Sequence, residues 1–134
     1  MTRLIWMYAM SLCLATGLLH QGVLADAVAF KDVKILSRNS PNSKPQKRDG
    51  YLNLDKTGNA IVFVRENRVL VTVPYSWIKD LSYERKHDHL FTVQYHDHRG
   101  QGQFVQFELG GDNRDQILAS VEADSGVKVS RILD

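Results

Sequence analysis

Four histidines occur within twelve residues, in the stretch KHDHLFTVQYHDHRG that spans residues 86–100. They form two His-Asp-His triplets separated by an apolar run. Imidazole nitrogens bind zinc, copper and nickel, and such a site needs several of them about 2 Å from one ion. The residue types therefore point first to a divalent-metal site, with these candidate ligands: His87, His89, His96 and His98.

The spacing of the histidines limits this metal hypothesis. Alternate residues of a strand share a face, which would pair His87 with His89 and His96 with His98. His87 and His96 are nine residues apart, which is about 30 Å of extended strand at roughly 3.3 Å per residue. Each triplet is therefore half a site that needs a nearby carboxylate, another segment or a second copy of the chain. The alternative is that both triplets are polar strand ends and turns.

Patterns for catalysis are weak. The chain has no Gly-x-Ser-x-Gly elbow that would expose a serine beside a base. Its one cysteine, Cys13, lies in the N-terminal apolar run, and its removal with that run excludes thiol catalysis and Cys-ligated zinc. We expect neither an enzyme nor a cofactor.

The N-terminal residues have the order of a secretory signal. Arg3 precedes an apolar run over residues 4–19, and the small residues Ala25 and Ala27 follow, with no acidic residue before Asp26. We expect cleavage after Ala25 or Ala27 and export to the periplasm or the cell exterior. The apolar run is slightly short for a membrane span of about 20 residues. Since cleavage removes this run, we expect no stable membrane span in the mature chain. An uncleaved anchor is the alternative.

Removal of residues 1–25 leaves 109 of the 134 residues, enough for one domain with one core. This domain, residues 26–134, has 16 Lys/Arg and 15 Asp/Glu, because Arg3 is the one charged residue removed. A net charge near +1 creates no broad positive field, which argues against nucleic acid as a partner. Without cysteine, the domain depends on its hydrophobic core for stability.

The mature chain is predicted to be mainly β. Apolar and polar residues alternate with period two through most of it, the pattern of half-buried strands. The polar residues 38–49 contain two prolines and predict a disordered loop. The expected strands cover residues 28–37, 51–55, 59–65, 68–73, 79–86, 89–96 and 103–109, with a last extended segment at 127–133.

The period changes to that of a helix after Gly110 and Gly111. Asp112 is expected to be the N-cap, and Asp115 to place a favourable charge in the first turn. Gly126 is expected to end the helix in the left-handed conformation. The apolar stripe of this helix consists of Ile117, Leu118 and Val121.

Residues 50–132 resemble the small bacterial pleckstrin-homology-like (PH-like) domains related to GRAM domains. The likeness rests on a glycine-led strand (GYLNLD), a hairpin (IVFVRENRVLVTV), a Pro-Tyr-Ser-x-Ile corner and a helix that ends in Gly-Val-Lys-Val. It implies a PH-like barrel of about seven antiparallel strands, with one C-terminal helix at an open end. It also implies a non-catalytic binding platform, although fold likeness alone does not name the ligand.

Two sets of residues are candidates for ligand contact. Lys44, Lys47 and Arg48 lie in an early loop comparable to the one that binds lipid phosphate in PH-like domains, but not in that family's Lys-x(n)-Lys/Arg-x-Arg order. Of Tyr75 and Trp77, at the corner, one is expected to be exposed and to mark a partner surface. The alternatives are a solvated loop for the charges and core-edge packing for the aromatic residues.

We therefore expect an exported, non-catalytic binding or protein-interaction module. Its expected partner is another envelope protein or envelope component, and self-association through an edge strand is a further expectation. The second hypothesis is a divalent-metal-binding periplasmic protein that uses the two histidine triplets.

Overall fold

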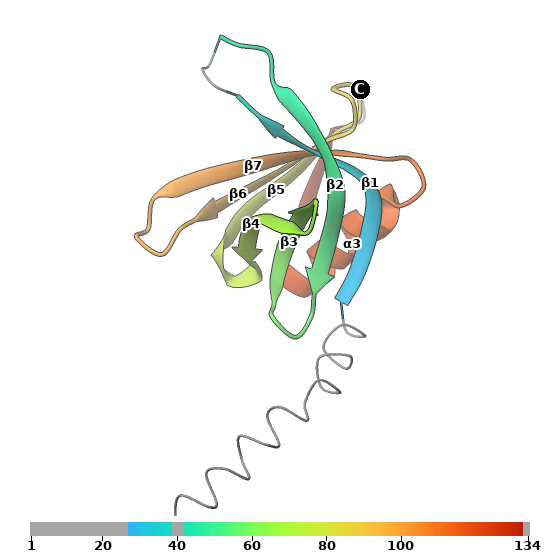
Figure 1. Cartoon of the computed structure of the whole chain (residues 1–134). Coiled ribbons are helices and arrows are strands. Elements are labelled where there is room, and N and C mark those ends of the chain that lie inside the picture. The colour runs from blue at the N-terminus through green and yellow to red at the C-terminus, as the bar shows by residue number, and fades with distance from the viewer. Residues whose placement is uncertain (1–26, 39–41, 133–134) are drawn as a thin grey trace, which may run out of the picture.

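A computed structural model describes residues 27–38 and 42–132 (Figure 1). The predicted signal, residues 1–25, lies outside these described residues, as do residues 39–41 of the predicted loop. The helical elements are the short 3-10 helix η1 (Tyr75–Trp77) and α3 (Arg114–Ser125). The strands are β1 (Ala27–Ser37), β2 (Gln46–Asp55), β3 (Ala60–Arg65), β4 (Arg68–Pro74), β5 (Ile78–Glu84), β6 (Leu90–His96), β7 (Gly102–Leu109) and β8 (Val129–Ile132).

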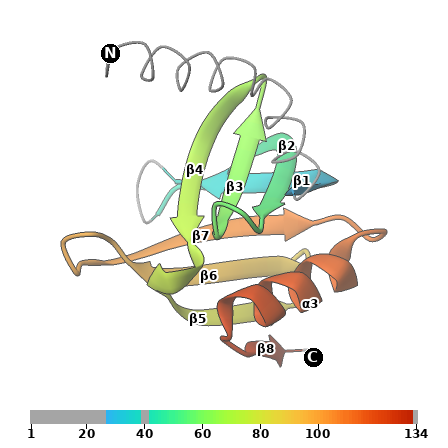
Figure 2. The ribbon, with the colours of Figure 1, turned by 90° about the horizontal axis from the view of Figure 1, so that it is seen from below.

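The eight strands form one open sheet in the order β4-β3-β2-β1-β7-β6-β5-β8. Figure 2 shows that β2–β4 run across the direction of β5–β7, with α3 beside β5 and β8. The prediction of a mainly β fold with a C-terminal helix is confirmed. The prediction of about seven antiparallel strands in a barrel was wrong. The chain after α3 returns as an eighth strand parallel to β5, and β4 and β8 remain as separate edges.

β1 joins the two halves of the sheet and bends at a bulge. Its pairing with β2 shifts register between Phe30 and Val33, and Asp32 has a φ of 60°. From Val33 onward β1 pairs with β7 as well as β2. The Gly110 N–H donates to the Asp32 carbonyl oxygen at 2.9 Å, and a Cβ on Gly110 would lie 2.8 Å from that oxygen. Only glycine allows this approach.

The core lies between the two halves of the sheet and is closed by α3. Phe107 of β7 contacts Phe63 of β3 and Phe91 of β6, with ring centroids 5.7 Å and 6.5 Å apart. Burying a side chain of this size contributes about 1.5–3 kcal/mol. The predicted stripe of α3 is confirmed, because Ile117, Leu118 and Val121 are fully buried in the same cluster.

The start of α3 differs from the prediction. Asn113 rather than Asp112 precedes the helix, and no side chain caps its first turn. The Asn113 amide instead donates to the Lys31 carbonyl oxygen of β1 at 3.4 Å. The expected end is confirmed, since Gly126 has a φ of 74°. Within residues 27–38 and 42–132, no helix is long and apolar enough to cross a membrane.

The β1–β2 arm is longer than the sequence predicts. Gln46–Asp49 pair with Lys34–Ser37, so the predicted loop 38–49 extends too far at its C-terminal end. All four residues from Gln46 to Asp49 are exposed. An arm that lies outside the core needs no apolar alternation, and for this reason the period-two pattern missed it.

Candidate functional site

The two histidine triplets lie at opposite ends of β6. His87, Asp88 and His89 form the turn after β5, where Asp88 and His89 both have a φ of 55°. His96 is the last residue of β6, and His98 lies in the next turn. The shared-face argument was therefore wrong for both pairs, since His87 and His89 are not in a strand and His98 lies beyond the end of β6. The prediction that each triplet is separate from the other is confirmed.

Each histidine has different surroundings. The Tyr83 hydroxyl lies 2.7 Å from His89 Nδ1, and the two rings stack with centroids 6.2 Å apart. His98 lies over Trp77, with centroids 6.4 Å apart, and His87 and His96 are exposed. In the part of the chain that the structure describes, no group of three or more His, Cys, Asp or Glu residues is placed to hold a metal ion. The metal hypothesis stays a prediction from sequence.

Asp97, between the histidines of the second triplet, organises its own turn. Its carboxylate accepts hydrogen bonds from the N–H groups of Arg99 and Gln101, both at 2.9 Å, and from the Gln103 amide at 3.3 Å. The bond from Gln101 is the main reason that the pKa of Asp97 is lowered. These bonds give the acidic residue between the two histidines a structural role in the turn after β6.

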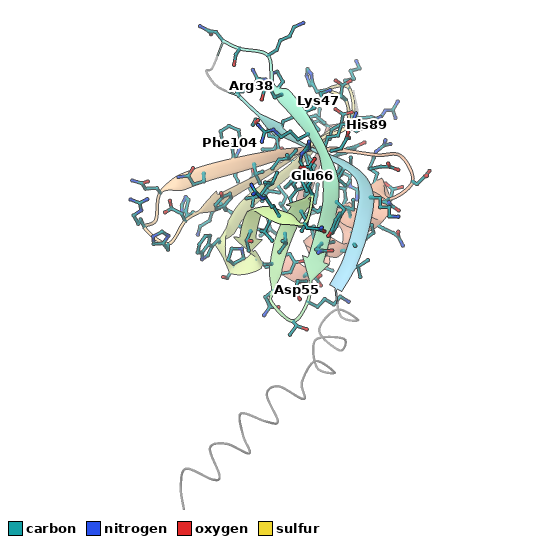
Figure 3. All side chains as sticks on the ribbon, viewed as in Figure 1. Arg38, Lys47, Asp55, Glu66, His89 and Phe104 are labelled. Atoms are coloured by element: carbon teal, nitrogen blue, oxygen red, sulfur yellow. The ribbon has the colours of Figure 1, made fainter. Side chains whose placement is uncertain are left out.

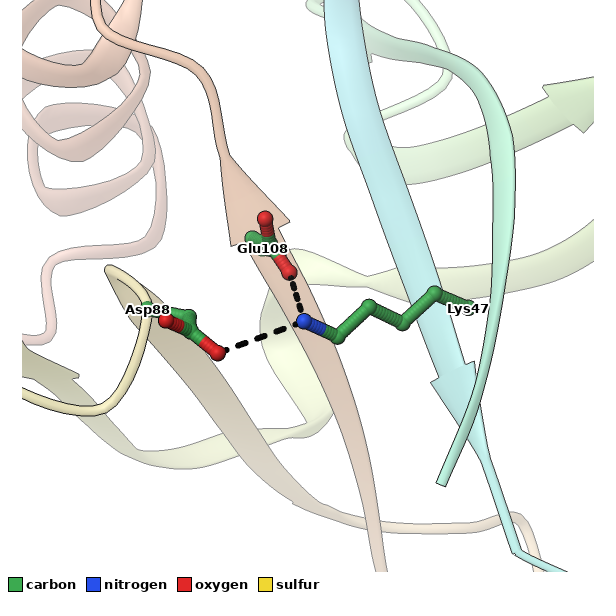
Figure 4. Close-up of polar contacts among 3 residues, drawn as sticks. All are labelled: Lys47, Asp88 and Glu108. Carbon is green, nitrogen blue, oxygen red and sulfur yellow. Dashed lines mark hydrogen bonds and ion pairs between the residues drawn. The ribbon is translucent and has the colours of Figure 1, made fainter. Parts of the chain in front are cut away.

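Lys47 lies in a groove between the β1–β2 arm and the turn after β5. Its ammonium group forms ion pairs with Glu108 at 2.6 Å and with Asp88 at 3.3 Å (Figure 4). Hydrogen bonds to these two carboxylates raise the pKa of Lys47. An anionic ligand here would compete with both partners, and Glu84 adds a third carboxylate to the groove wall.

The other predicted basic residues do not join Lys47 in this groove. Lys44 and Arg48 are both exposed, and neither lines the groove, whose volume is about 300 Å³. Arg38 does line it and donates to the Ser43 carbonyl oxygen at 3.3 Å. Figure 3 shows Arg38, Lys47 and His89 at the same end of the molecule. Arg38 and Lys47 thus line the same groove as His87 of the first triplet. The sequence did not predict this proximity.

The corner aromatic residues are largely covered. Tyr75 is buried, and its N–H donates to the Asn59 carbonyl oxygen at 2.7 Å. Trp77 is half-buried and stacks on Tyr95, with centroids 6.3 Å apart. The expectation that one of the two is exposed was therefore wrong, because η1 turns Tyr75 into the core and Tyr95 covers Trp77.

The exposed aromatic residue is Phe104 on β7, with 66% of its surface accessible. A hollow of about 300 Å³ lies beside it. We call the residues that line this hollow the Phe104 surface: Lys79, Gln94, Tyr95, His96, Gly102, Gln103 and Phe104. A sequence signal existed, since Phe104 is an apolar residue on the face of β7 that otherwise carries Gln106 and Glu108.

The outer face of the sheet continues from the Phe104 surface as a row without charge. Ser82 of β5, Thr92 of β6 and Gln106 of β7 lie opposite one another in register. The Gln106 amide donates to the Thr92 hydroxyl at 3.2 Å. The next row places Glu84 and Glu108 on either side of Leu90. On the other side, the row of Phe104 contains Asp80 of β5, opposite Gln94 of β6. The outer face therefore has one uncharged row between two rows that each contain a carboxylate.

Comparison with family models gave no match, and comparison with curated proteins gave none either. Among solved structures, the chain is similar to the structure of the Spt16D Pob3N heterodimer, with a TM-score of 0.52 and 10% sequence identity. The match covers 78% of this chain and 53% of that chain, so this chain spans about half the length of the solved one. The fold is PH-like.

The PH-like sheet leaves one long edge open. β4 pairs with β3 on one side and with no strand of the described chain on the other. Val69 and Leu70 in this edge strand are 60% and 41% exposed. An edge with exposed apolar residues is a surface on which another strand can pair.

Proposed function

We propose that the protein is an exported, non-catalytic interaction module that binds another envelope protein through the Phe104 surface. The observation that carries this proposal is the 66% exposure of Phe104 beside an uncharged row of the sheet. An exposed aromatic anchor next to uncharged surface, with polar residues around it, is typical of protein–protein interfaces. The similar PH-like structure, solved as a heterodimer, supports the same class of function.

The export part of the proposal rests on residues 1–25, with their basic start, apolar run and small residues at the expected cleavage site. The non-catalytic part rests on the lack of a nucleophile elbow in the sequence and on the placement of Cys13 in the signal. Of the two expected partners, a protein of the envelope and another envelope component, we propose the protein.

The test is affinity capture from envelope extract, followed by purification of the captured protein and direct measurement of its affinity. We expect Phe104→Ser to weaken that affinity by about tenfold or more, as loss of a central aromatic anchor does. Because Phe104 is exposed, the variant should fold normally, which circular dichroism and thermal unfolding would check.

The matched control is Ile132→Ser, which removes an apolar residue that is 48% exposed at the far edge, on β8. If Phe104→Ser loses affinity and Ile132→Ser does not, the partner binds at the Phe104 surface. Equal losses in the two variants, or an unchanged affinity in Phe104→Ser, would contradict the proposal.

A further inference from the structure

A second hollow, of about 410 Å³, lies between the turn after β2 and the C-terminal end of α3. Its wall includes Asn59, Tyr75, Ser76, Asp124 and Ser125. It is separate from the Phe104 surface, with which it shares no lining residue. Its lining includes one carboxylate, Asp124, and no lysine or arginine, which suits a positively charged ligand.

The last turn of α3 places negative charge where the helix itself is negative. Glu122 and Asp124 both lie in this turn, and no basic residue does. The carboxyl end of a helix carries roughly half a negative charge, so cations are favourable there and carboxylates are not. Among the described residues, no ion pair joins either carboxylate to Lys128, the lysine nearest in sequence, or to Lys56 of the turn after β2.

Three polar side chains in or near this hollow accept hydrogen bonds from backbone N–H groups, and Asp124 differs from them. The Glu122 carboxylate accepts from the Val129 N–H at 2.7 Å, and the Asp55 carboxylate accepts from the Gly58 N–H at 2.9 Å. The Ser125 hydroxyl oxygen accepts from the Val127 N–H at 3.1 Å. The exposed Asp124 carboxylate is not used in this way.

The Tyr75 hydroxyl is the second polar group at this hollow, and Asp124 is the charged group that acts on it most strongly. Tyr75 is 5% exposed, its hydroxyl is buried, and that hydroxyl forms no hydrogen bond of good geometry within the described chain. Buried polar groups nearly always have partners, and an exception calls for a bound water, ion or ligand. Burial raises the pKa of Tyr75, and the negative charge of Asp124 together with a hydrogen bond of poorer geometry to that carboxylate raises it further. The hydroxyl thus stays protonated and retains lone pairs that accept a hydrogen bond.

We propose that this hollow binds the ammonium or guanidinium group of a lysine or arginine side chain from a partner protein. Asp124 supplies the counter-charge, the Tyr75 hydroxyl accepts one N–H, and the carboxyl end of α3 adds its negative potential. Charge-assisted hydrogen bonds of this kind are about twice as strong as neutral ones. The inference goes beyond the proposed function, because it depends neither on Phe104 nor on the identity of that partner.

The test is a titration of the ¹⁵N-labelled protein, followed by NMR, with acetylated and amidated Gly-Lys-Gly and Gly-Arg-Gly peptides. Gly-norleucine-Gly serves as the uncharged probe and Ca²⁺ as the metal probe. We expect saturable shifts of the amides of Asn59, Ser76 and Ser125 with the two cationic peptides. The norleucine peptide should bind at least about tenfold more weakly, since it lacks the charged hydrogen bonds.

Asp124→Asn should weaken binding of the cationic peptides by about tenfold, and Tyr75→Phe by a smaller factor. Asp112→Asn, a change of an exposed carboxylate before the other end of α3, is the matched control and should leave binding unchanged. Equal binding of the norleucine peptide, or an unchanged affinity in Asp124→Asn, would overturn the proposal. Tighter binding of Ca²⁺ than of both peptides at the same amides would overturn it in favour of a metal site.

Discussion

Gly50 lies where β2 passes the ring of Phe63. A Cβ at position 50 would lie 2.5 Å from Phe63 Cζ and 2.5 Å from the Val64 carbonyl oxygen. Phe63 is fully buried and the carbonyl belongs to β3, so neither can move without disturbing the sheet. Overpacking of this kind typically costs about 1–3 kcal/mol. We expect Gly50→Ala to lower the free energy of unfolding by this amount, as measured by urea denaturation.

Gly102 provides the control for this substitution. It also lies in a strand, but a Cβ there would come no closer than 4.0 Å, to the His96 ring. Gly102→Ala should therefore change the free energy of unfolding by less than about 0.5 kcal/mol. Similar losses in the two variants would show that the effect comes from backbone freedom rather than from the contact with Phe63.

Single residues also show where prediction from sequence ends. The basic character of Lys47 is evident in the sequence, yet its partners Asp88 and Glu108 lie on other elements, and only the fold brings them together. Tyr75 and Trp77 look alike in a local pattern, but η1 buries the first and Tyr95 covers the second. Phe104 was visible as a break in alternation, and its importance depends on the face that the fold leaves open.

At the scale of elements, period-two alternation located most strands, because a half-buried strand must alternate. It missed Gln46–Asp49, which are exposed on both sides of the arm. It also gave no information on pairing, so the parallel alignment of β8 with β5 and the open edge at β4 emerged only in the structure. Local patterns define elements, whereas pairing depends on contacts between distant segments.

The open edge of β4 leads to a prediction of self-association. Natural edge strands usually carry charges or prolines that oppose pairing. β4 has Arg68 at its start and Pro74 at its end, but the residues between them are uncharged. Two copies paired antiparallel about Val71 would place Arg68 opposite Pro74, so no like charges would meet. We expect sedimentation velocity to show a dimer that forms as the protein concentration rises.

Leu70→Lys tests this edge directly. In this register a lysine at position 70 would lie opposite Thr72 of the second copy. It should weaken the dimer by about tenfold or more, since charge on an edge strand opposes pairing. Ser130→Lys places the same charge on β8, the opposite edge, and should have no effect. A monomer at every concentration, or a dimer that persists in Leu70→Lys, would contradict the prediction.

At the scale of the whole molecule, the predicted signal ends almost where the sheet begins. β1 starts at Ala27, which pairs with Asp55 of β2. Cleavage after Ala25 would keep all of β1 in the mature chain, whereas cleavage after Ala27 would remove its first residue. A retained anchor over the apolar run 4–19 would leave the seven residues 20–26 between the membrane segment and the sheet. We therefore expect the exported protein to begin at Asp26, with 109 residues.

Intact-mass measurement of protein recovered from the envelope of a bacterial host checks this expectation. Ala25→Arg places a large charged residue where the signal peptidase requires a small one, and should leave the 134-residue chain uncleaved. Ala27→Arg is the matched control and should still be cleaved after Ala25. A block in both variants would instead place the cleavage site after Ala27, because Ala25 would then be the small residue three positions before the cut. A wild-type protein that keeps all 134 residues would identify the N-terminal segment as an anchor, with the sheet held at the membrane surface.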